Sequence, residues 1–270
     1  EMQLEIEAPV DAVWKALTDG PDLARWFPLE AKVTPGAGGS IWQAWGEMFA
    51  ATSQIEIWEP LKRLRTTWPF VHTPAEGEEP CRVLVDYFME STGGKTVLRI
   101  VHSGFGRGAK WDAEYDGVSR GWAFELRGLR HYLEHHRGED RQVVWCIRPV
   151  TGDLGEAWNR VMGDEGLRAL SQLEGAKEGT PYKFTSGDGN TFEGRVGLFV
   201  PPRQFAATVT NLNNAWMRVE AESCSGSSSI WLWASTYGVS RDRVESIKQG
   251  WDAMLDRLFG KVATPVGANA

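Results

Sequence analysis

The same helical pattern occurs at two distant places in the sequence. A Gly-Trp pair is followed by leucines four and seven residues after the tryptophan. The pattern comprises Gly121-Trp122, Leu126 and Leu129 in the first place and Gly250-Trp251, Leu255 and Leu258 in the second. The three-and-four spacing predicts an amphipathic helix each time. Self-similarity at such a long period predicts two copies of one fold.

Features upstream of the two helices repeat as well. Trp58-Glu59-Pro60 in the first half matches Phe199-Val200-Pro201 in the second. A length of 270 residues suits two domains of about 135 residues each. We therefore expect one domain over residues 1–138, a second over 141–262, and a disordered tail over 263–270.

The expected order of elements is similar in both halves: a strand, short helical segments, a meander of strands and one long helix. Alternating apolar residues predict strands, and the periodic stripes predict helices. The fold class is thus α+β. In the first half, strands are expected at 3–8, 40–48, 51–58, 62–70, 81–90 and 95–103, with helices at 10–17, around Leu23, Trp26 and Phe27, and at 113–136. In the second half, strands are expected at 142–149, 181–186, 190–200, 204–210, 214–222 and 229–237, with helices around Trp158 and at 240–259. The second copy lacks one early strand.

Charge and cysteine content exclude several classes of protein. The net charge is −7, and the whole acidic excess lies in the first 140 residues. Without a basic stripe, nucleic acid and anionic membranes are poor partners. No apolar stretch is long enough to span a membrane. Three scattered cysteines without a CxxC motif predict neither a disulfide framework nor a zinc knuckle, and indicate a cytoplasmic protein.

Tryptophan is unusually frequent, with 14 residues in 270. Tryptophan fills protein cores, but it also lines apolar ligand cavities and interfaces. The excess therefore favours an aromatic-lined cavity in addition to an ordinary core.

The first half resembles a known family at residues spread over its whole length. These are Ala8-Pro9, Val13-Trp14, Ala16-Leu17-Thr18, Trp26-Phe27, Glu59-Pro60, Leu64, Thr67-Trp68, His102-Ser103-Gly104-Phe105, Gly121-Trp122, Leu126, Leu129 and Tyr132-Leu133. In this order they resemble the SRPBCC or START-like superfamily, in the branch related to the C-terminal domain of the Hsp90 ATPase activator (AHSA1-like). The second half resembles the same fold through the repeat, but it has no counterpart of His102-Ser103-Gly104-Phe105.

The resemblance implies two helix-grip domains. In each, a curled antiparallel sheet would wrap around a long C-terminal helix, with two short helices after the first strand and an apolar cavity between sheet and helix. Members of the superfamily bind lipids, polyketides or hormones, act as cyclases or hydrolases, or act as co-chaperones. Since one fold hosts many functions, the resemblance leaves the function open.

Strand parity predicts which side chains face the cavity. Arg99 points to water, so Ile100 and His102 point inward, and Tyr87 and Met89 point inward from the preceding strand. In the run 40–48, either Trp42 or the set Gln43, Trp45 and Glu47 faces the cavity. The predicted ligand-binding residues are Trp42, Trp45, Trp68, Tyr87, Met89, Ile100, His102 and Trp122.

His102 is the best candidate for a polar role, as a general base or a hydrogen-bond donor to a ligand. In the alternative, its ring bonds a backbone carbonyl and supports the turn at Gly104. A second motif, His131-Tyr-Leu-Glu134-His135, matches the H-x-x-E-H pattern of some zinc proteases. It falls in the last turns of the expected helix, where histidine complements the helix dipole, so we expect no metal there.

The leading functional prediction is binding of a small, mostly apolar molecule in the first domain, with the second domain supporting or capping it. One alternative is an enzyme of the cyclase, hydrolase or lyase type that uses His102 in the same cavity. Another is a protein-interaction module like the co-chaperones of the superfamily. No cofactor is expected.

Strand 229–237 predicts an interface because both of its faces are apolar or aromatic. Ile230 and Leu232 alternate with Trp231 and Trp233. A tryptophan-rich face left in water would expose a large apolar patch. We therefore expect Trp231 and Trp233 to form an interface between the two domains or between two copies in a homodimer. In the alternative, these tryptophans line a cavity of the second domain.

Overall fold

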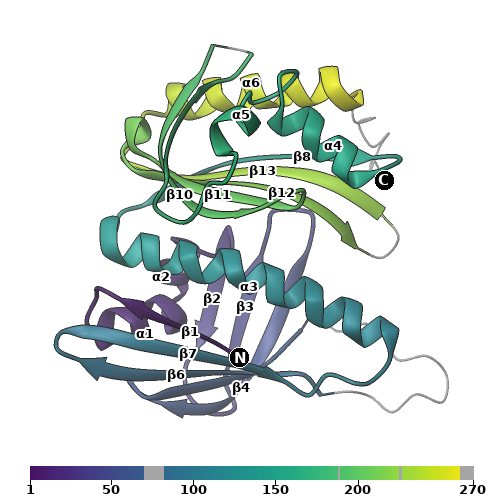
Figure 1. Cartoon of the computed structure of the whole chain (residues 1–270). Coiled ribbons are helices and arrows are strands. Elements are labelled where there is room, and N and C mark those ends of the chain that lie inside the picture. Colours follow the sequence, from purple (N-terminus) through teal and green to yellow (C-terminus); the bar gives the residue numbers. More distant parts are fainter. Residues whose placement is uncertain (70–81, 188, 225–226, 262–270) are drawn as a thin grey trace, which may run out of the picture. The chain divides into compact units, whose positions relative to one another are not determined.

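The chain forms two compact units, which are Glu1–Glu139 and Asp140–Ala270. A computed structural model describes residues 1–69, 82–187, 189–224 and 227–261 (Figure 1). The segment 263–270, expected to be a disordered tail, lies outside the described residues. Each unit has its own antiparallel sheet and its own helices. The expected α+β class is therefore confirmed, and the curl of each sheet around its helix stays a prediction.

The sheet of the first unit has seven antiparallel strands in the order β1-β7-β6-β5-β4-β3-β2. Because β1 and β2 are both edges, the sheet is open. The strands are β1 (Met2–Ile6), β2 (Glu30–Thr34), β3 (Ser40–Ala44), β4 (Ala50–Glu59), β5 (Arg63–Thr67), β6 (Leu84–Thr92) and β7 (Lys95–Ser103). Strand β2 was not predicted, because its sequence has no apolar run, and none of its residues is buried.

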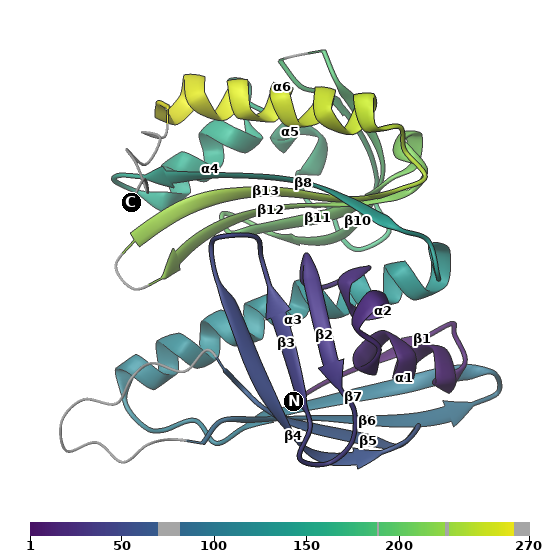
Figure 2. The same ribbon diagram turned by 180° about the vertical axis from the view of Figure 1, so that it is seen from behind.

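Three helices complete the first unit: α1 (Val10–Thr18), α2 (Gly20–Ala24) and α3 (Ala109–His135). Helix α2 begins where the Asp19 side chain accepts a hydrogen bond from the backbone N–H of Asp22, and it lies beside β2 (Figure 2). It ends before Trp26 and Phe27, which the sequence pattern had placed on this helix. Their backbone N–H groups bond back to the carbonyl of Leu23 in the turn that follows.

Helix α3 lies across the first sheet (Figure 1) and contributes much of the core. Its residues Leu126, Leu129 and Leu133 are all buried, as the spacing of the stripe predicts. Burying a leucine side chain contributes about 1.5–3 kcal/mol. The stripe therefore anchors the helix along much of its length.

A buried carboxylate ties the three helices together. Asp22 is only 5% exposed and forms ion pairs with Lys15 and Arg25. The Tyr132 hydroxyl on α3 donates a hydrogen bond to Asp22 and accepts one from the backbone N–H of Gly138. Burial by itself would raise the pKa of Asp22, but these partners hold that pKa below its usual value. The end of α3 is thereby fixed on α1 and α2.

The second unit repeats this arrangement with one strand fewer. Its sheet has the order β8-β13-β12-β11-β10-β9, so each of its strands has a counterpart in the first unit. Strand β2 of the first unit has no counterpart in this sheet. The strands are β8 (Arg141–Val150), β9 (Pro181–Thr185), β10 (Thr191–Val200), β11 (Gln204–Val209), β12 (Ala215–Cys224) and β13 (Ser227–Tyr237). The helices α4 (Leu154–Met162), α5 (Leu170–Leu173) and α6 (Arg241–Phe259) lie on one face of the sheet (Figure 1).

Large side chains fill the core of the second unit. Trp158 from α4 and Trp251 from α6 are fully buried, as are Phe192 and Phe205 from the sheet. The ring of Trp251 lies 6.0 Å from that of Phe192. The tryptophan of the repeated Gly-Trp pattern is therefore a core residue in this unit.

Strand β13 separates its two kinds of side chain by face. Ile230, Leu232 and Ala234 belong to the core cluster that contains Trp251. Trp231 and Trp233 lie on the opposite face, because successive strand residues point to opposite sides. The alternative in which these tryptophans line a cavity of the second domain is therefore wrong.

None of the helices in the described part of the chain has the length and apolar character that a membrane span requires.

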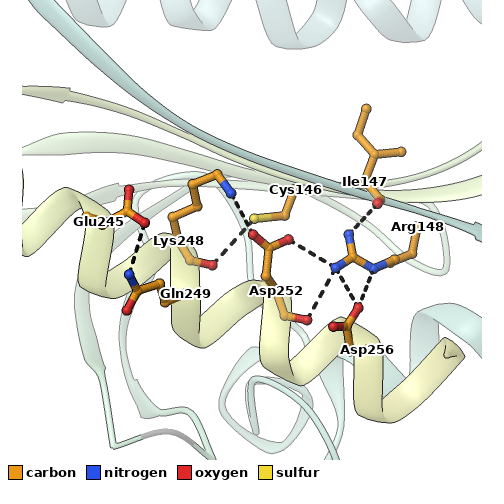
Figure 3. A network of polar contacts seen from close by, with 8 residues as sticks. All are labelled: Cys146, Ile147, Arg148, Glu245, Lys248, Gln249, Asp252 and Asp256. Atoms are coloured by element: carbon orange, nitrogen blue, oxygen red, sulfur yellow. Dashed lines mark hydrogen bonds and ion pairs between the residues drawn. The ribbon is translucent and has the colours of Figure 1, made fainter. Parts of the chain in front are cut away.

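A polar network holds α6 on β8 (Figure 3). The Arg148 guanidinium donates to Asp256 at 2.9 and 2.7 Å and to the Asp252 carboxylate at 3.1 Å. Asp252 also pairs with Lys248 at 2.6 Å. Burial by itself would raise the pKa of Asp252, but Lys248 and Arg148 hold it below its usual value. Beside them, burial raises the pKa of the Cys146 thiol to about 12, so the thiol stays protonated.

Removing one carboxylate from this network should destabilise the second unit. We expect Asp256→Asn to lower its free energy of unfolding by about 1–3 kcal/mol, since Arg148 would keep its charge and lose the negative charge that pairs with it. Glu245→Gln on the same helix is a matched control, because Glu245 is exposed and bonds only to Gln249 in this network (Figure 3). Calorimetry of the full chain measures both changes. Equal effects of the two substitutions would show that the network does not stabilise the unit.

Candidate functional site

The candidate site lies on the inward face of β6 and β7 in the first unit. In the register of these strands, Tyr87 is opposite Ile100 and Val85 is opposite His102. Tyr87 and His102 are therefore diagonal neighbours on the same face, within reach of one large side chain. Trp122 of α3 is that side chain. Its ring centroid lies 6.0 Å from Tyr87 and 6.4 Å from His102.

A side-chain hydrogen bond joins the helix to the sheet at this point. The indole Nε1–H of Trp122 donates to Nδ1 of His102 at 3.1 Å. The imidazole also lies among other aromatic rings. The centroids of Trp68 and Phe105 are each 4.7 Å from it. His102 is thus held in one orientation by one hydrogen bond and several ring contacts.

The bond from Trp122 determines where the imidazole proton lies. Because Nδ1 accepts a hydrogen bond, the proton of the neutral ring is on Nε2. Nε2 is buried and has no partner among the described residues. Burial lowers the pKa of His102 to about 4, so the ring is neutral at physiological pH. His102 therefore offers an unpaired N–H donor, and its other nitrogen is already occupied.

The turn that follows His102 depends on glycine. Gly104 has a φ of +88°, and a Cβ added there would lie 2.1 Å from the backbone oxygen of Arg82. Only glycine fits such a position. Among the described residues, Nδ1 is bonded to Trp122 and Nε2 has no partner, so the alternative in which the His102 ring bonds a backbone carbonyl to support this turn is wrong.

Aromatic residues from the turn after α2 continue the enclosure. The ring of Phe27 stacks on Trp26 at 5.2 Å and meets Trp45 edge-on at 5.2 Å. Phe27 also lies 6.5 Å from Trp122. Strand parity cannot place Phe27 or Phe105, because neither is on a strand, although both belong to motifs that carry the family resemblance.

Two small cavities lie beside this aromatic cluster. The first has a volume of about 20 Å³. It is lined by Leu17, Leu23, Trp26, Phe27, Ile41, Gln43, Ser53, Leu64, Thr66, Trp68, Pro69 and Tyr87. The second, also of about 20 Å³, is lined by Glu1, Met2, Ile100, His102, Tyr115, Val118, Ser119 and Trp122. Each has room for about one water molecule.

Seven of the eight predicted ligand-binding residues fall into two groups. Trp68, Tyr87, Ile100, His102 and Trp122 line one or other of the two cavities. Trp45 and Met89 are buried but line neither.

The remaining candidates lie on β3 or shortly after it. Gln43 lines the first cavity, whereas Trp42 lies on the other face of the strand, beneath the ammonium group of Lys32. Glu47 is exposed. A role in ligand binding stays a prediction for every residue of the set.

A larger groove lies on the outside of the first unit, between β1 and α3. Its volume is about 720 Å³. It is lined by Met2, Gln3, Leu4, Glu5, Glu7, Trp122, Ala123, Leu126, Arg127, Arg130 and Glu134. Close to half of these side chains are charged, so the groove is chemically unlike the two cavities.

The H-x-x-E-H motif lies in the last turns of α3. The ring centroids of His131 and His135 are 4.9 Å apart, and Glu134 accepts a hydrogen bond from the backbone N–H of Glu7. Within the described ranges, no group of three or more His, Cys, Asp or Glu side chains is placed to hold a metal ion.

The fold and the site define an α+β protein of two similar units, the first with an aromatic-lined interior. Residues 7–134 match the model of the family described as activator of Hsp90 ATPase homolog 1-like protein. The first unit is therefore an AHSA1-like domain, as its sequence motifs predict. The match ends before the second unit.

Several solved structures are similar to this chain. A Mesorhizobium loti protein is 23% identical, covers 50% of this chain and 97% of its own, and has a TM-score of 0.43. DynU16, encoded in the dynemicin biosynthetic locus, is 19% identical, covers 95% and 94%, and has a TM-score of 0.43. CalU16 from Micromonospora echinospora is 27% identical, covers 48% and 70%, and has a TM-score of 0.37. No curated protein matches the chain.

The lowered pKa of His102 predicts a pH dependence of stability. Unfolded histidine titrates near pH 6.5, whereas folded His102 titrates at about 4. As the pH falls through this window, the unfolded state takes up the proton first. Stability should therefore fall between pH 6.5 and 4, by up to about 3 kcal/mol.

Hydrogen exchange of the β7 amides in the full chain at pH 7 and pH 4.5 measures this loss. His102→Phe should show a smaller loss, because it removes the titrating ring. An equal loss in the variant would assign the effect to other groups.

Proposed function

We propose that the first unit binds a small, mostly apolar molecule between α3 and the inward face of its sheet. The observation that carries the proposal is the unpaired Nε2–H of His102, held inside an aromatic enclosure by the bond from Trp122. A buried donor without a partner costs about 1–3 kcal/mol. A ligand with an acceptor would recover that cost and bury its own apolar surface.

The same geometry favours binding over catalysis. A general base needs a free lone pair and a pKa near the working pH. In His102, Nδ1 accepts from Trp122, Nε2 carries the proton, and burial lowers the pKa to about 4. Neither ring nitrogen has a carboxylate partner among the described residues. A ligand-binding role fits these features better than the cyclase, hydrolase or lyase alternative.

The second unit is proposed to support the first without binding a ligand of its own. Where the first unit has cavities, the second has a core filled by Trp158, Trp251, Phe192 and Phe205. Arg148 and its two aspartates occupy the boundary between β8 and α6. A cytoplasmic location stays a prediction.

A co-chaperone-like role is the second candidate, and the groove between β1 and α3 favours it. Protein interfaces combine an apolar centre with a charged rim, and this groove joins Leu4 and Leu126 with Arg127, Arg130 and Glu134. Its volume of about 720 Å³ exceeds that of either cavity.

Native mass spectrometry of the purified chain tests the binding proposal. We expect a co-purified small molecule, or one acquired from a metabolite extract. Ser119→Trp should abolish this adduct, because Ser119 lines the cavity that contains His102. Ser246→Trp, at an exposed position of α6, should keep it. A chain that never carries an adduct, or an adduct that survives in Ser119→Trp, would contradict the proposal.

The outer face of β13 is proposed to be a protein interface. Trp145 on β8 lies 5.8 Å from Trp231 and 5.2 Å from Trp233, so the three rings form one patch. The guanidinium groups of Arg218 and Arg141 lie over the ring of Trp233 at 5.0 and 5.7 Å. Tryptophan and arginine are enriched at interface centres.

Replacing the patch should reveal which surface covers it. If two copies associate through it, light scattering should show a dimer for the natural chain and a monomer for Trp231→Ser/Trp233→Ser. If the patch is covered within one chain, the natural chain should be monomeric. The two calorimetric unfolding transitions of the variant should then lie further apart in temperature than those of the natural chain. If the natural chain is monomeric and the variant unfolds as the natural chain does, the patch is not an interface.

A further inference from the structure

On the inward face of β6 and β7, two hydrogen-bond donors have no hydrogen-bond partner among the described residues. One is the Nε2–H of His102, which is buried. The other is the hydroxyl of Tyr87, which has no hydrogen bond among the described residues and whose pKa is raised by burial. Both groups are protonated at neutral pH, and they are diagonal neighbours on the same face of the sheet. The pair therefore presents donors to the interior.

The cavities beside these donors provide little charge. Among the described residues that line them, the only carboxylate is that of Glu1, which pairs with Arg99 at 3.6 Å. No lysine or arginine lines either cavity. An ionised carboxylate moved into such a site would lose its hydration without gaining a lysine or arginine partner from the lining. A cationic ligand would gain contacts with the aromatic faces, but its charged group would offer no acceptor to the two donors.

The shape of the enclosure favours a flat ligand. Trp68 lines the first cavity and Trp122 the second, with their ring centroids 6.0 Å apart. Phe27 lies 6.5 Å from Trp122. Each cavity alone holds about one water. A ring-sized ligand must therefore displace one of these side chains and replace its ring contacts. A planar ring system makes such contacts better than a flexible chain.

We propose that the first unit is selective for an uncharged, planar ring compound whose carbonyl oxygen accepts a hydrogen bond from Nε2 of His102. Tyr87 supplies a second donor, and Trp122 is a positioning residue that keeps the His102 proton on Nε2. This inference rests on the proposed binding function and adds the chemical class of the ligand.

Three probes with the same ring distinguish the ligand classes. They are 2-acetylnaphthalene, which has a carbonyl, 2-ethylnaphthalene, which lacks it, and 2-naphthoate, which is charged at pH 7. Titration calorimetry with the full chain should show that the ketone binds about tenfold more tightly than the hydrocarbon, since one hydrogen bond to a buried donor is at stake. The carboxylate should bind more weakly than the ketone.

Variants then assign the selectivity to named residues. His102→Phe should remove the preference for the ketone, and Tyr87→Phe should reduce it. The control His135→Phe, which replaces an exposed histidine of the same unit, should leave the preference intact. Near-ultraviolet circular dichroism checks that each variant keeps its aromatic packing.

The role of Trp122 has a readout that is independent of any ligand. Nitrogen-15 shifts of the His102 ring should show the proton on Nε2 in the natural chain. In Trp122→Phe the ring should exchange between its two tautomers, because the bond to Nδ1 is gone. An unchanged tautomer in that variant would overturn the positioning role.

The outcomes separate the two proposals. Equal binding of ketone and hydrocarbon, or tighter binding of the carboxylate, overturns the ligand class and leaves binding itself intact. If no probe binds and native mass spectrometry finds no adduct, the binding function itself is wrong.

Discussion

The first unit depends on how one helix covers the apolar face of one open sheet. An antiparallel sheet can leave one face in water, but its other face must be buried. Helix α3 does this through Leu126, Leu129 and Leu133, and Asp22 fixes its C-terminal end on α1 and α2. The position of Trp122 follows from this packing, because it is the next residue of the same stripe toward the N-terminus. The bond from Trp122 to His102 is thus a consequence of core packing.

The two units use one scaffold and fill it differently. In the first, the tryptophan of the Gly-Trp pattern donates to a histidine and adjoins small cavities. In the second, Trp251 is fully buried against Phe192, and a polar network around Arg148 joins α6 to β8. A duplicated fold therefore carries a candidate site in one copy, whereas Trp158, Trp251, Phe192 and Phe205 fill the described core of the other. This is the physical basis for assigning binding to the first unit.

Strand parity placed much of the first unit's interior, because side chains alternate with a period of two. Tyr87, Ile100 and His102 line the cavities as their parity indicates. Parity left the two faces of β3 open, and the structure has Gln43 at the cavity and Trp42 on the far side. Parity also predicts that side chains on the outward face of the sheet are exposed to water. Asp86 on that face is nonetheless only 3% exposed, because Arg63 and Arg65 from β5 cover it with ion pairs.

The sequence by itself determined the duplication, the α+β class, the stripes of the long helices and the family of the first half. These features depend on spacing within single elements, which the order of residues records directly. Only the tertiary structure decided that Trp122 reaches Nδ1 of His102, that Nε2 is left unpaired, and that Phe27 and Phe105 complete the enclosure. Those contacts join residues from different elements. Their geometry depends on how the helix and the turns pack on the sheet, which no local pattern specifies.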